Sequence, residues 1–543
     1  AHPDAAIGLG ITGHEDEVTD YSPEGHAARA ALARRALAAI EQCEPADAGE
    51  RAAKAVFTER TGLDVELHEA GRDLAELNVI ASPVHELRIV FDLMPHETAQ
   101  DWETIAARMA KVPAAMDGVR ASLLASSETG RVAALRQVAK VAEQCETWAG
   151  LHGDAGYFAT LVAGAGQANG IPDALGRDLG HHAHVAQEAF AEFAGFLRAE
   201  LAPLAPSKDA VGADVYRLCS RYFTGATLDL REAYEWGWDE FTRIEAEMRD
   251  VAGRIRPGAT LAEVAVLLDA DPRYRLAGQD ALRQWMQTLS DDALKSLRGK
   301  HFDIPDELMA LECLIAPPGG GVGAYYTGPN EDFSRPGRMW WSVPPGKAEF
   351  STWREVTTVY HEGVPGHHLQ IACAVHQAAS LNRYQRIMAF TSGHAEGWAL
   401  YAERLMAELG FLADDGDLLG MLDAHLFRAA RVVVDIGMHL ELEIPAGTGF
   451  HEGERWSPEL GLEFLLTRTI SDPDHVHDEI DRYLGWPGQA PSYKLGERLW
   501  LTAREEARQR AGADFDLKDF HSRALVLGGM GLDTLREQLA RMD

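Results

Sequence analysis

The chain has 543 residues, of which 46% are hydrophobic and 25% are charged. These proportions are typical of a globular protein and exclude a disordered, collagenous or coiled-coil chain. The balance of 51 Lys and Arg against 84 Asp and Glu gives a formal net charge of −33. Such a charge repels the phosphate backbone that dominates nucleic-acid affinity, and it also disfavours anionic membrane surfaces. We therefore expect neither a nucleic-acid nor a membrane partner.

The cellular compartment is predicted from the cysteines and from the first residues. Five scattered cysteines favour neither a disulfide framework nor a cysteine metal site, and they indicate a reducing compartment. Residues 1–20 are acidic and lack the basic and apolar regions of a signal peptide, although a chain that starts at Ala could already have been trimmed. No run approaches the roughly 18 consecutive apolar residues of a transmembrane helix. We expect a cytoplasmic protein, with a homodimer as the default oligomer.

The first part of the chain has a helical pattern. From residue 22 to about 300, apolar residues recur at three- and four-residue spacing, and Pro and Gly lie mostly at the joints. This pattern predicts an N-terminal helical lobe over residues 1–300. Its clearest predicted helices are 24–44, 72–81, 132–149, 181–201 and 228–251.

The sequence pattern changes at Phe302, where Pro, Gly and aromatic residues cluster. Short β-like runs at 313–316, 324–327 and 338–343 predict a small antiparallel sheet. The intervening Pro-Pro-Gly-Gly-Gly run, 317–321, lacks the Lys-Ser/Thr pair and the helix of a phosphate loop. Helical periodicity returns after residue 351, with breaks at 365–366, 446–456 and 486–488. We predict a catalytic lobe over residues 301–543 and a mostly α protein, with two helical lobes around a deep cleft and the sheet beside the active-site helix.

The strongest chemical signal is an incomplete zinc motif. In an HExxH helix, two His on one face both reach Zn²⁺, and the Glu beside the first His acts as a general base. His361 and Glu362 match the first half, but the position of the second His is Pro365. Because proline breaks or kinks a helix, the chain after it could return a later His to the site. We favour His367 as the second ligand over His368.

A third ligand is expected from a second helix. Glu396 follows His367 by 29 residues, enough for one helix to end and another to return antiparallel. Glu403 lies on nearly the same face, where it could hold a ligating His by its other ring nitrogen. Two neutral His and one carboxylate leave an open position, which is typical of catalytic zinc, although the set also suits Mn²⁺, Co²⁺ or Fe²⁺. The structural alternative is a His-rich loop beside a salt-bridged helix.

Four segments resemble the motif set of a known family. They are His361-Glu-Gly-Val-Pro-Gly-His-His-Leu-Gln370, Glu396-Gly-Trp-Ala-Leu-Tyr401, Asp435-Ile-Gly-Met-His439 and Trp486-Pro-Gly-Gln-Ala-Pro-Ser-Tyr-Lys494. In kind and order they look like those of the bacterial family called domain of unknown function 885. That family is similar in motif logic to the helical zinc peptidases of the thimet oligopeptidase and carboxypeptidase Taq type. The resemblance implies a zincin-like or gluzincin-like metallopeptidase, and the PGHH sequence is where this chain departs from the simple pattern.

Further residues are candidates for stabilising an oxyanion, which needs a donor beyond the metal. Tyr493 precedes a predicted helix at 495–511, and the resemblance to the oligopeptidases implies a substrate-facing Tyr in this region. A structural Tyr at a helix start is the alternative. His439 lies one helical turn after Asp435, whose carboxylate could orient the imidazole, and His439 is a second candidate donor. An ordinary buried hydrogen-bonded pair is equally expected.

Substrate-binding candidates complete the site. Arg482 or Lys494 could bind the terminal carboxylate of a peptide. Tyr325 and Tyr326 lie in a predicted strand ahead of the active helix, and an edge strand there would pair with an extended substrate. Because side chains alternate along a strand, at most one of the two tyrosines should face the cleft.

These residues predict a hydrolase with one Zn²⁺ per chain that cleaves peptide or related amide bonds, most readily in short peptides. A dipeptidase, a carboxypeptidase or an oligopeptidase would fit. One alternative is a metal-dependent hydrolase of other amides. Another is a catalytically inactive peptide-binding protein with the same fold. This alternative stays open because Pro365 occupies the position of the second His in the zinc motif.

Overall fold

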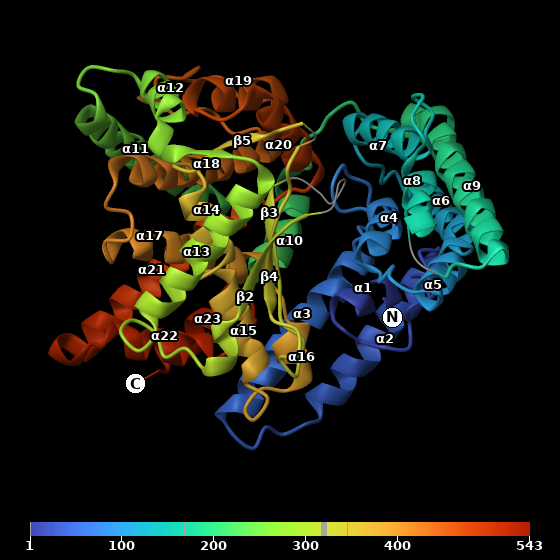
Figure 1. Ribbon diagram of the computed structural model, residues 1–543, viewed down its shortest axis with the longest axis horizontal. Coiled ribbons are helices and arrows are strands. Elements are labelled where there is room, and N and C mark those ends of the chain that lie inside the picture. The colour runs from blue at the N-terminus through green and yellow to red at the C-terminus, as the bar shows by residue number, and fades with distance from the viewer. Residues whose placement is uncertain (1, 168–169, 317–322, 345, 543) are drawn as a thin grey trace. The chain divides into compact units, whose positions relative to one another are not determined.

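A computed structural model describes residues 2–167, 170–316, 323–344 and 346–542 (Figure 1). The run 317–321, in which the sequence argues against a phosphate loop, lies outside these residues. The chain packs as two units, and both are mostly helical, as the sequence predicts. Unit 1 comprises Ala1–Cys43, Thr61–Asp209 and Leu484–Trp486, and unit 2 comprises Glu44–Arg60, Ala210–Tyr483 and Pro487–Asp543.

Unit 1 is a helical bundle in which α9 packs against α5, α6, α7 and α8 (Figure 1). The edge-to-face contact between Phe91 and Phe158 and the packing of Phe158 on Phe190 lie in its core. Its elements are α1 (Pro3–Gly8), α2 (Pro23–Glu41), the end of α3 (Ala48–Glu69), α4 (Pro83–Leu93), α5 (Ala99–Met109), α6 (Val112–Glu128), α7 (Leu135–Trp148), α8 (Tyr157–Ala163), η1 (Gly164–Gln167), α9 (Asp173–Phe196), η2 (Leu197–Leu201) and η3 (Ala202–Leu204).

The predicted helix over 72–81 is wrong, because this segment is a turn between α3 and α4. Gly71, with a φ of 66°, ends the path of α3. Asn78 then accepts hydrogen bonds through Oδ1 from the backbone N–H groups two and three residues ahead, at 2.9 and 2.7 Å. Such a side-chain turn competes with helical backbone hydrogen bonds, and apolar spacing alone does not reveal it.

Unit 2 holds the remaining helices. These are α10 (Gly212–Thr224), α11 (Leu230–Ile255), α12 (Leu261–Ala270), η4 (Pro272–Tyr274), α13 (Gln279–Leu297), η5 (Asp306–Met309), α14 (Val356–Glu362), α15 (His367–His376), α16 (Arg383–Ile387), α17 (Ser392–Glu408), α18 (Asp415–Leu440), α19 (Pro458–Arg468), α20 (Pro473–Gly485), α21 (Ser492–Ala511), η6 (Gly512–Asp514), α22 (Leu517–Leu525) and α23 (Leu532–Ala540). In the part of the chain that is described, none of the helices combines the length and apolar character needed to cross a membrane.

Helices α10–α13 belong to unit 2 by packing, whereas the sequence assigns residues up to 300 to the N-terminal lobe. The reason is visible in α11, which lies along α18 (Figure 1). Its aromatic face supplies Trp238 and Phe241, which both pack against Phe464 of α19. Trp238 and Phe241, in the helix predicted at 228–251, are therefore core residues of unit 2.

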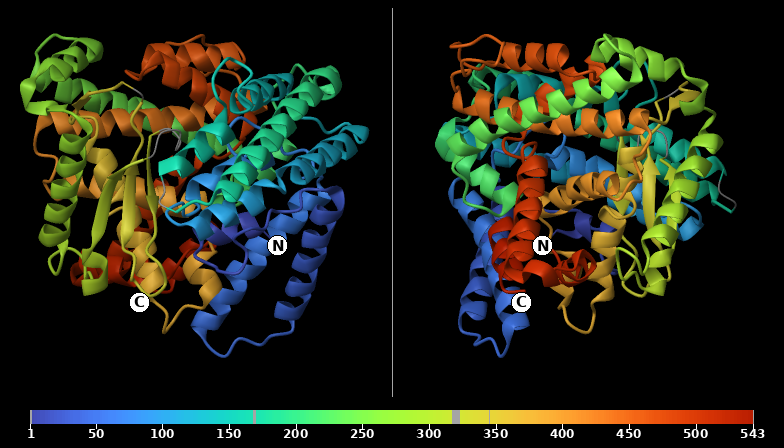
Figure 2. Two further views of the ribbon diagram at one scale, coloured as in Figure 1. Left: turned by 45° about the vertical axis from the view of Figure 1, so that its right-hand side comes forward. Right: turned by 90° about the vertical axis from the view of Figure 1, so that its left-hand side faces the viewer.

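The three predicted strands are present as β2 (Leu311–Ile315), β3 (Ala324–Thr327) and β4 (Gly337–Trp341), and they form one sheet in the order β2-β4-β3 (Figure 2). The prediction that this sheet is antiparallel is wrong for one of its two strand pairs. β4 is antiparallel to β3 but parallel to β2, because the last strand in sequence lies between the first two. A separate antiparallel pair joins β1 (Arg275–Ala277) to β5 (Glu349–Ser351).

The three-stranded sheet lies beside the end of α14. A side-chain carbon at Gly363, the residue after that helix, would lie 3.0 Å from Met339 of β4 and 3.4 Å from Leu311 of β2. Helix α13 packs along β2, where Gln287 hydrogen-bonds to the backbone of Leu311 and Cys313. The sheet therefore supports the segment that follows His361 and Glu362.

Candidate metal centre

The helix that begins the zinc motif breaks where proline predicts a break. α14 ends at Glu362 and α15 begins at His367, and the peptide bond before Pro365 is cis. A side-chain carbon on Gly366 would lie 1.9 Å from the carbonyl oxygen of His361, so only glycine fits this close return of the chain. Trp398 of α17 donates a hydrogen bond to the Pro365 carbonyl at 2.8 Å and holds the turn in place.

This return brings the second imidazole to the first. The rings of His361 and His367 have centroids 4.7 Å apart, and one potential ligand atom from each of His361, Glu362 and His367 lies within 4.8 Å of the others. From α17, Glu396 Oε2 lies 3.2 Å from Nε2 of His361 and 3.6 Å from Nε2 of His367. Two imidazoles and two carboxylates therefore converge on one point.

The cluster fits a divalent cation. His361, Glu362 and His367 are 5%, 7% and 8% exposed, yet Glu362 Oε2 and His367 Nδ1 have no hydrogen-bond partner. Buried polar atoms are nearly always paired, so the unpaired Glu362 oxygen beside the converging imidazoles is consistent with a site for a ligand. Imidazole nitrogen and carboxylate oxygen are ligands that zinc prefers. The buried cluster could hold a metal ion, and its geometry alone does not identify which one.

Electrostatics support the same interpretation. Burial raises the pKa of Glu362, and the imidazoles of His367 and His361 oppose that rise. Burial also favours the neutral form of Glu396, but its contacts with the two imidazoles outweigh burial and hold the pKa well below its usual range. For His361, burial alone would lower the pKa, whereas the hydrogen bonds to Glu396 and Glu403 raise it overall. The carboxylates around His361 thus favour positive charge at this point.

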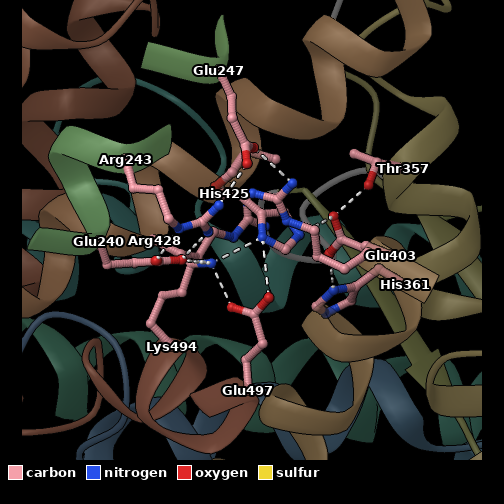
Figure 3. A network of polar contacts seen from close by, with 12 residues as sticks. Glu240, Arg243, Glu247, Thr357, His361, Glu403, His425, Arg428, Lys494 and Glu497 are labelled. Carbon is pink, nitrogen blue, oxygen red and sulfur yellow. Dashed lines mark hydrogen bonds and ion pairs between the residues drawn. The ribbon is translucent and has the colours of Figure 1, made fainter. Parts of the chain in front are cut away.

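Glu403 contacts the ring nitrogen of His361 that points away from Glu396, as its position on α17 predicts (Figure 3). Its Oε1 lies 2.7 Å from His361 Nδ1, and the Thr357 hydroxyl donates to Oε2. Burial would raise the pKa of Glu403, but the adjacent imidazoles of His361 and His425 outweigh burial and lower it. The Glu403 carboxylate therefore accepts the Nδ1 proton of His361, which leaves Nε2 facing Glu396 and His367.

His368 is engaged away from the cluster. Its Nε2 donates to the carbonyl of Leu308 at 2.8 Å, and its Nδ1 accepts from the Tyr326 hydroxyl at 3.0 Å. Burial lowers the pKa of His368 to about 4, so the ring is neutral and both of its nitrogens are used. The structure brings His367, not His368, to His361.

The two predicted strand tyrosines point to opposite faces, as alternation requires. Tyr326 reaches His368, and the ring of Tyr325 is stacked with that of Trp340 at a centroid distance of 6.1 Å. Their strand, β3, is at the edge of the described sheet.

Lys494 is not placed for substrate binding. Its side chain is 0% exposed, and Nζ donates to Glu240 and to His425 Nδ1, each at 3.0 Å, and also to Glu497 (Figure 3). These contacts use the three N–H groups of an ammonium, so we do not retain Lys494 as a carboxylate anchor. Sequence reasoning missed His425 and Glu497; the i, i+3 pair of Lys494 and Glu497 on one helix was the available signal.

Arg482, the other residue predicted to bind the terminal carboxylate of a peptide, also has partners within the protein. It donates to Glu479 at 2.9 Å and to Gln489 at 2.6 Å. Tyr493 is half-buried at the start of α21, with the Arg431 guanidinium 4.8 Å from its ring centroid.

His439 and Asp435 have the buried environment of structural groups. His439 Nε2 donates to the Tyr483 carbonyl at 2.9 Å, and Asp435 accepts from the Tyr216 hydroxyl at 2.5 Å. The closest approach between the His439 and Asp435 side chains is 3.9 Å, which is beyond hydrogen-bond distance. His439 follows His425 by 14 residues on α18, about 21 Å at 1.5 Å per residue, so it does not reach the cluster beside Glu403.

The fold and this cluster define a class: a mostly helical protein with a buried His-Glu-His group that could bind a metal. The chain belongs to the family described as "Bacterial protein of unknown function (DUF885)", whose model matches residues 3–539. This confirms the family that the sequence motifs resemble. No curated protein matches the sequence.

Two solved structures share the fold, and each is described as a "putative lipoprotein". The structure from Colwellia psychrerythraea is 23% identical, with a TM-score of 0.84, and the match covers 99% of this chain and 95% of that one. The structure from Shewanella oneidensis, described as of unknown function, is 17% identical, with a TM-score of 0.73, and the match covers 98% and 96% of the two chains. At these identities the likeness shows the fold alone.

Proposed function

We propose that the protein is a metal-dependent hydrolase of peptide or related amide bonds, with one Zn²⁺ held by His361, His367 and Glu396. The observation that carries the proposal is the convergence of these three side chains beside Glu362, whose buried Oε2 has no hydrogen-bond partner. Two imidazoles and one carboxylate form the three-ligand set of many catalytic zinc sites. Mn²⁺, Co²⁺ and Fe²⁺ suit the same ligands.

The residues divide the chemistry between them. A bound cation would supply Lewis-acid polarisation of the scissile carbonyl. Glu362, with one buried oxygen unpaired, takes the proton of the attacking water and passes it to the leaving amine. Glu403 keeps His361 in orientation. We propose Tyr493 as a hydrogen-bond donor to the developing oxyanion; it lies on α21, which packs along the helix that carries Glu396.

Short peptides are the proposed substrates. The motif resemblance to the thimet oligopeptidase and carboxypeptidase Taq enzymes supports peptide bonds. The low exposure of the cluster, with Glu396 the most open side chain at 17%, supports small or flexible substrates over folded proteins. The edge strand β3 offers backbone groups for an extended peptide, with Tyr325 or Tyr326 beside it.

The ligand set and the base are tested together. Glu396→Ala and His367→Ala should lose the metal, because each removes one of three ligands. Glu362→Gln should keep about one Zn²⁺ per chain and lower the turnover of short peptides by roughly 10²–10⁴-fold, the usual contribution of a general base. Metal content by mass spectrometry and peptide hydrolysis on the same preparations measure both effects.

His368→Ala is the matched control, since it removes the adjacent imidazole that lies outside the cluster. It should keep the metal. Loss of metal from Glu362→Gln but not from Glu396→Ala would exchange the roles of the two carboxylates. If the parent chain held no ion after supplementation, yet bound peptides, the protein would instead be an inactive peptide-binding protein. Turnover of other amides but not of peptides would identify a non-peptidase hydrolase.

For the location of the protein we propose the cell envelope. The two similar structures are described as lipoproteins, which supports this location, whereas the expectation of a cytoplasmic protein rests on the cysteines and the first residues alone. The homodimer stays a prediction.

A further inference from the structure

A chain of buried polar groups continues from Glu403 away from His361 (Figure 3). His425 of α18 has its Nε2 3.4 Å from Glu403 Oε2 and its Nδ1 3.0 Å from Lys494 Nζ. The side chains of Glu403, His425 and Lys494 are 1%, 0% and 0% exposed. These groups contact one another and not the solvent, so the position of each proton is set by its neighbours.

The direction of these hydrogen bonds follows from Lys494. An ammonium group has three N–H donors and no acceptor, and Lys494 has three partners in Glu240, Glu497 and His425. His425 Nδ1 must therefore accept; Glu497 Oε1 is farther from it, at 3.5 Å. Burial and the nearby ammonium lower the pKa of His425, so the ring is neutral. Its one N–H is then on Nε2, which faces Glu403.

Glu403 consequently faces donor groups on three sides. The Thr357 hydroxyl donates a hydrogen bond to Oε2 and His361 Nδ1 donates one to Oε1, and His425 Nε2 lies 3.4 Å from Oε2, an ion-pair contact without hydrogen-bond geometry. A carboxylate held in this way acts only as an acceptor. A metal ligand must be neutral imidazole, and in that form the single proton of His361 is thereby kept on Nδ1, so that Nε2, 3.2 Å from Glu396 Oε2, is the nitrogen left for a cation.

We propose that Lys494 and His425 are positioning residues of the metal centre. Acting through Glu403, they determine which nitrogen of His361 carries the proton and so present the other nitrogen to a divalent cation. This inference rests on the proposed function, because it takes His361 as a ligand. It assigns a role to a buried lysine and histidine that would otherwise be explained as packing.

Two substitutions of His425 test the direction of the hydrogen bonds. The amide of His425→Gln has a donor and an acceptor at a spacing similar to that of the two ring nitrogens, whereas His425→Leu fills space and has neither. The Zn²⁺ affinity of the full-length apoprotein is measured by competition with a chromophoric chelator. His425→Leu should weaken binding by about tenfold or more, the usual effect of losing an outer-shell partner, and His425→Gln should restore most of it.

His85→Leu is the control. His85 is 4% exposed and is hydrogen-bonded at both ring nitrogens, to Ser82 and Gln144, but it lies in unit 1 and should leave Zn²⁺ affinity unchanged. Thermal melting of each apoprotein separates a folding defect from a binding defect. Should His425→Leu not fold, His425→Asn replaces it, since this polar side chain is too short to contact both neighbours and should also lose affinity.

The outcomes separate this inference from the proposed function. Parent-like affinity in His425→Leu would overturn the positioning role and leave the metal site intact. Equal losses in the Leu and Gln variants would also overturn it, because the volume of the ring and not the direction of its hydrogen bonds would then matter. A parent chain that binds no Zn²⁺ would overturn the proposed function, and this inference with it.

Discussion

Asp435 is a residue whose titration should be visible in the stability of the protein. Its side chain is fully buried, and although it accepts hydrogen bonds from Tyr216 and from the backbone of Gly488, burial raises its pKa from 3.8 to about 7. Between these values the folded protein holds a proton that the unfolded chain has lost. The stability that this group contributes is therefore fully present below about pH 4 and is lost as the pH rises through 7.

We predict that Asp435→Asn removes this part of the pH dependence. At about 1.4 kcal/mol per pKa unit, the parent should lose on the order of 3–4 kcal/mol between pH 4 and 7 that the variant retains. Denaturant unfolding across this pH range gives the free energy of unfolding of both proteins. Titrating groups that the two proteins share cancel when one free energy is subtracted from the other. Asp214→Asn, at a fully exposed side chain, should have the same pH profile as the parent. A parallel profile for Asp435→Asn would contradict the assignment of the raised pKa.

Individual site residues could be predicted in part from the sequence. The pairing of His361 with Glu403, and the return of a His after Pro365, follow from helical spacing and from proline geometry, and the structure brings these residues together. The choice between His367 and His368 depended on the path of a four-residue turn, which periodicity does not describe. The substrate-binding role predicted for Lys494 is not supported, because a lysine at a helix start is usually exposed whereas Lys494 is buried, and its partners Glu240 and His425 come from distant segments.

The contact between α17 and α21 sets the position of the helix that carries Glu396. At their crossing, a side-chain carbon on Gly397 would lie 2.4 Å from the backbone of Gly496, and one on Gly496 would lie 2.0 Å from the carbonyl oxygen of Gly393. Backbone therefore packs directly on backbone. No side chain fits between the two helices, so their separation admits little variation.

We predict that Gly496→Ala lowers the stability by about 1–3 kcal/mol, as overpacking does, and weakens Zn²⁺ binding by displacing Glu396. Gly253→Ala is the control, because Gly253 lies in helix α11 with open space around it. There, alanine should raise the stability by roughly 0.5–1 kcal/mol. Urea unfolding and Zn²⁺ titration of both variants measure the effects. Unchanged metal affinity in Gly496→Ala would show that the position of Glu396 tolerates movement of α17.

Helices and strands could be predicted where their own local sequence determines them. Strand β3 and the break between α14 and α15 match their predictions closely. The parallel pairing of β2 with β4 could not be predicted, because it depends on which of three strands lies in the middle, and local pattern is the same in either order. The assignment of α10–α13 to unit 2 depends likewise on long-range partners such as Phe464.

The charge of the whole molecule affects any measurement of its metal content. A formal net charge of −33 attracts divalent cations loosely to the surface, and salt screens this attraction, since the Debye length is about 10 Å at 0.1 M and about 3 Å at 1 M. A buried ion held by His361 and His367 is screened much less. Low-salt preparations should therefore overstate the number of specific ions.

We predict that the number of bound Mn²⁺ or Zn²⁺ ions per chain exceeds one in about 10 mM salt and falls to about one in 0.5 M NaCl. Equilibrium dialysis followed by metal analysis measures the number. His367→Ala should lose the ion that salt does not remove, which distinguishes the site from the surface. Release of the last ion in parallel with the others, as salt rises, would identify it as one more surface counterion.

The break at Pro365 has a mechanical consequence. On a continuous helix, the spacing of two zinc-binding His residues is set by the helical rise, and a bound ion adds nothing to the packing of that helix. Here His361, His367 and Glu396 come from three helices, α14, α15 and α17, so an ion would act as a cross-link between them. Its affinity would then be adjustable through the length and tightness of the Gly363–Gly366 turn, without any change in the ligands themselves.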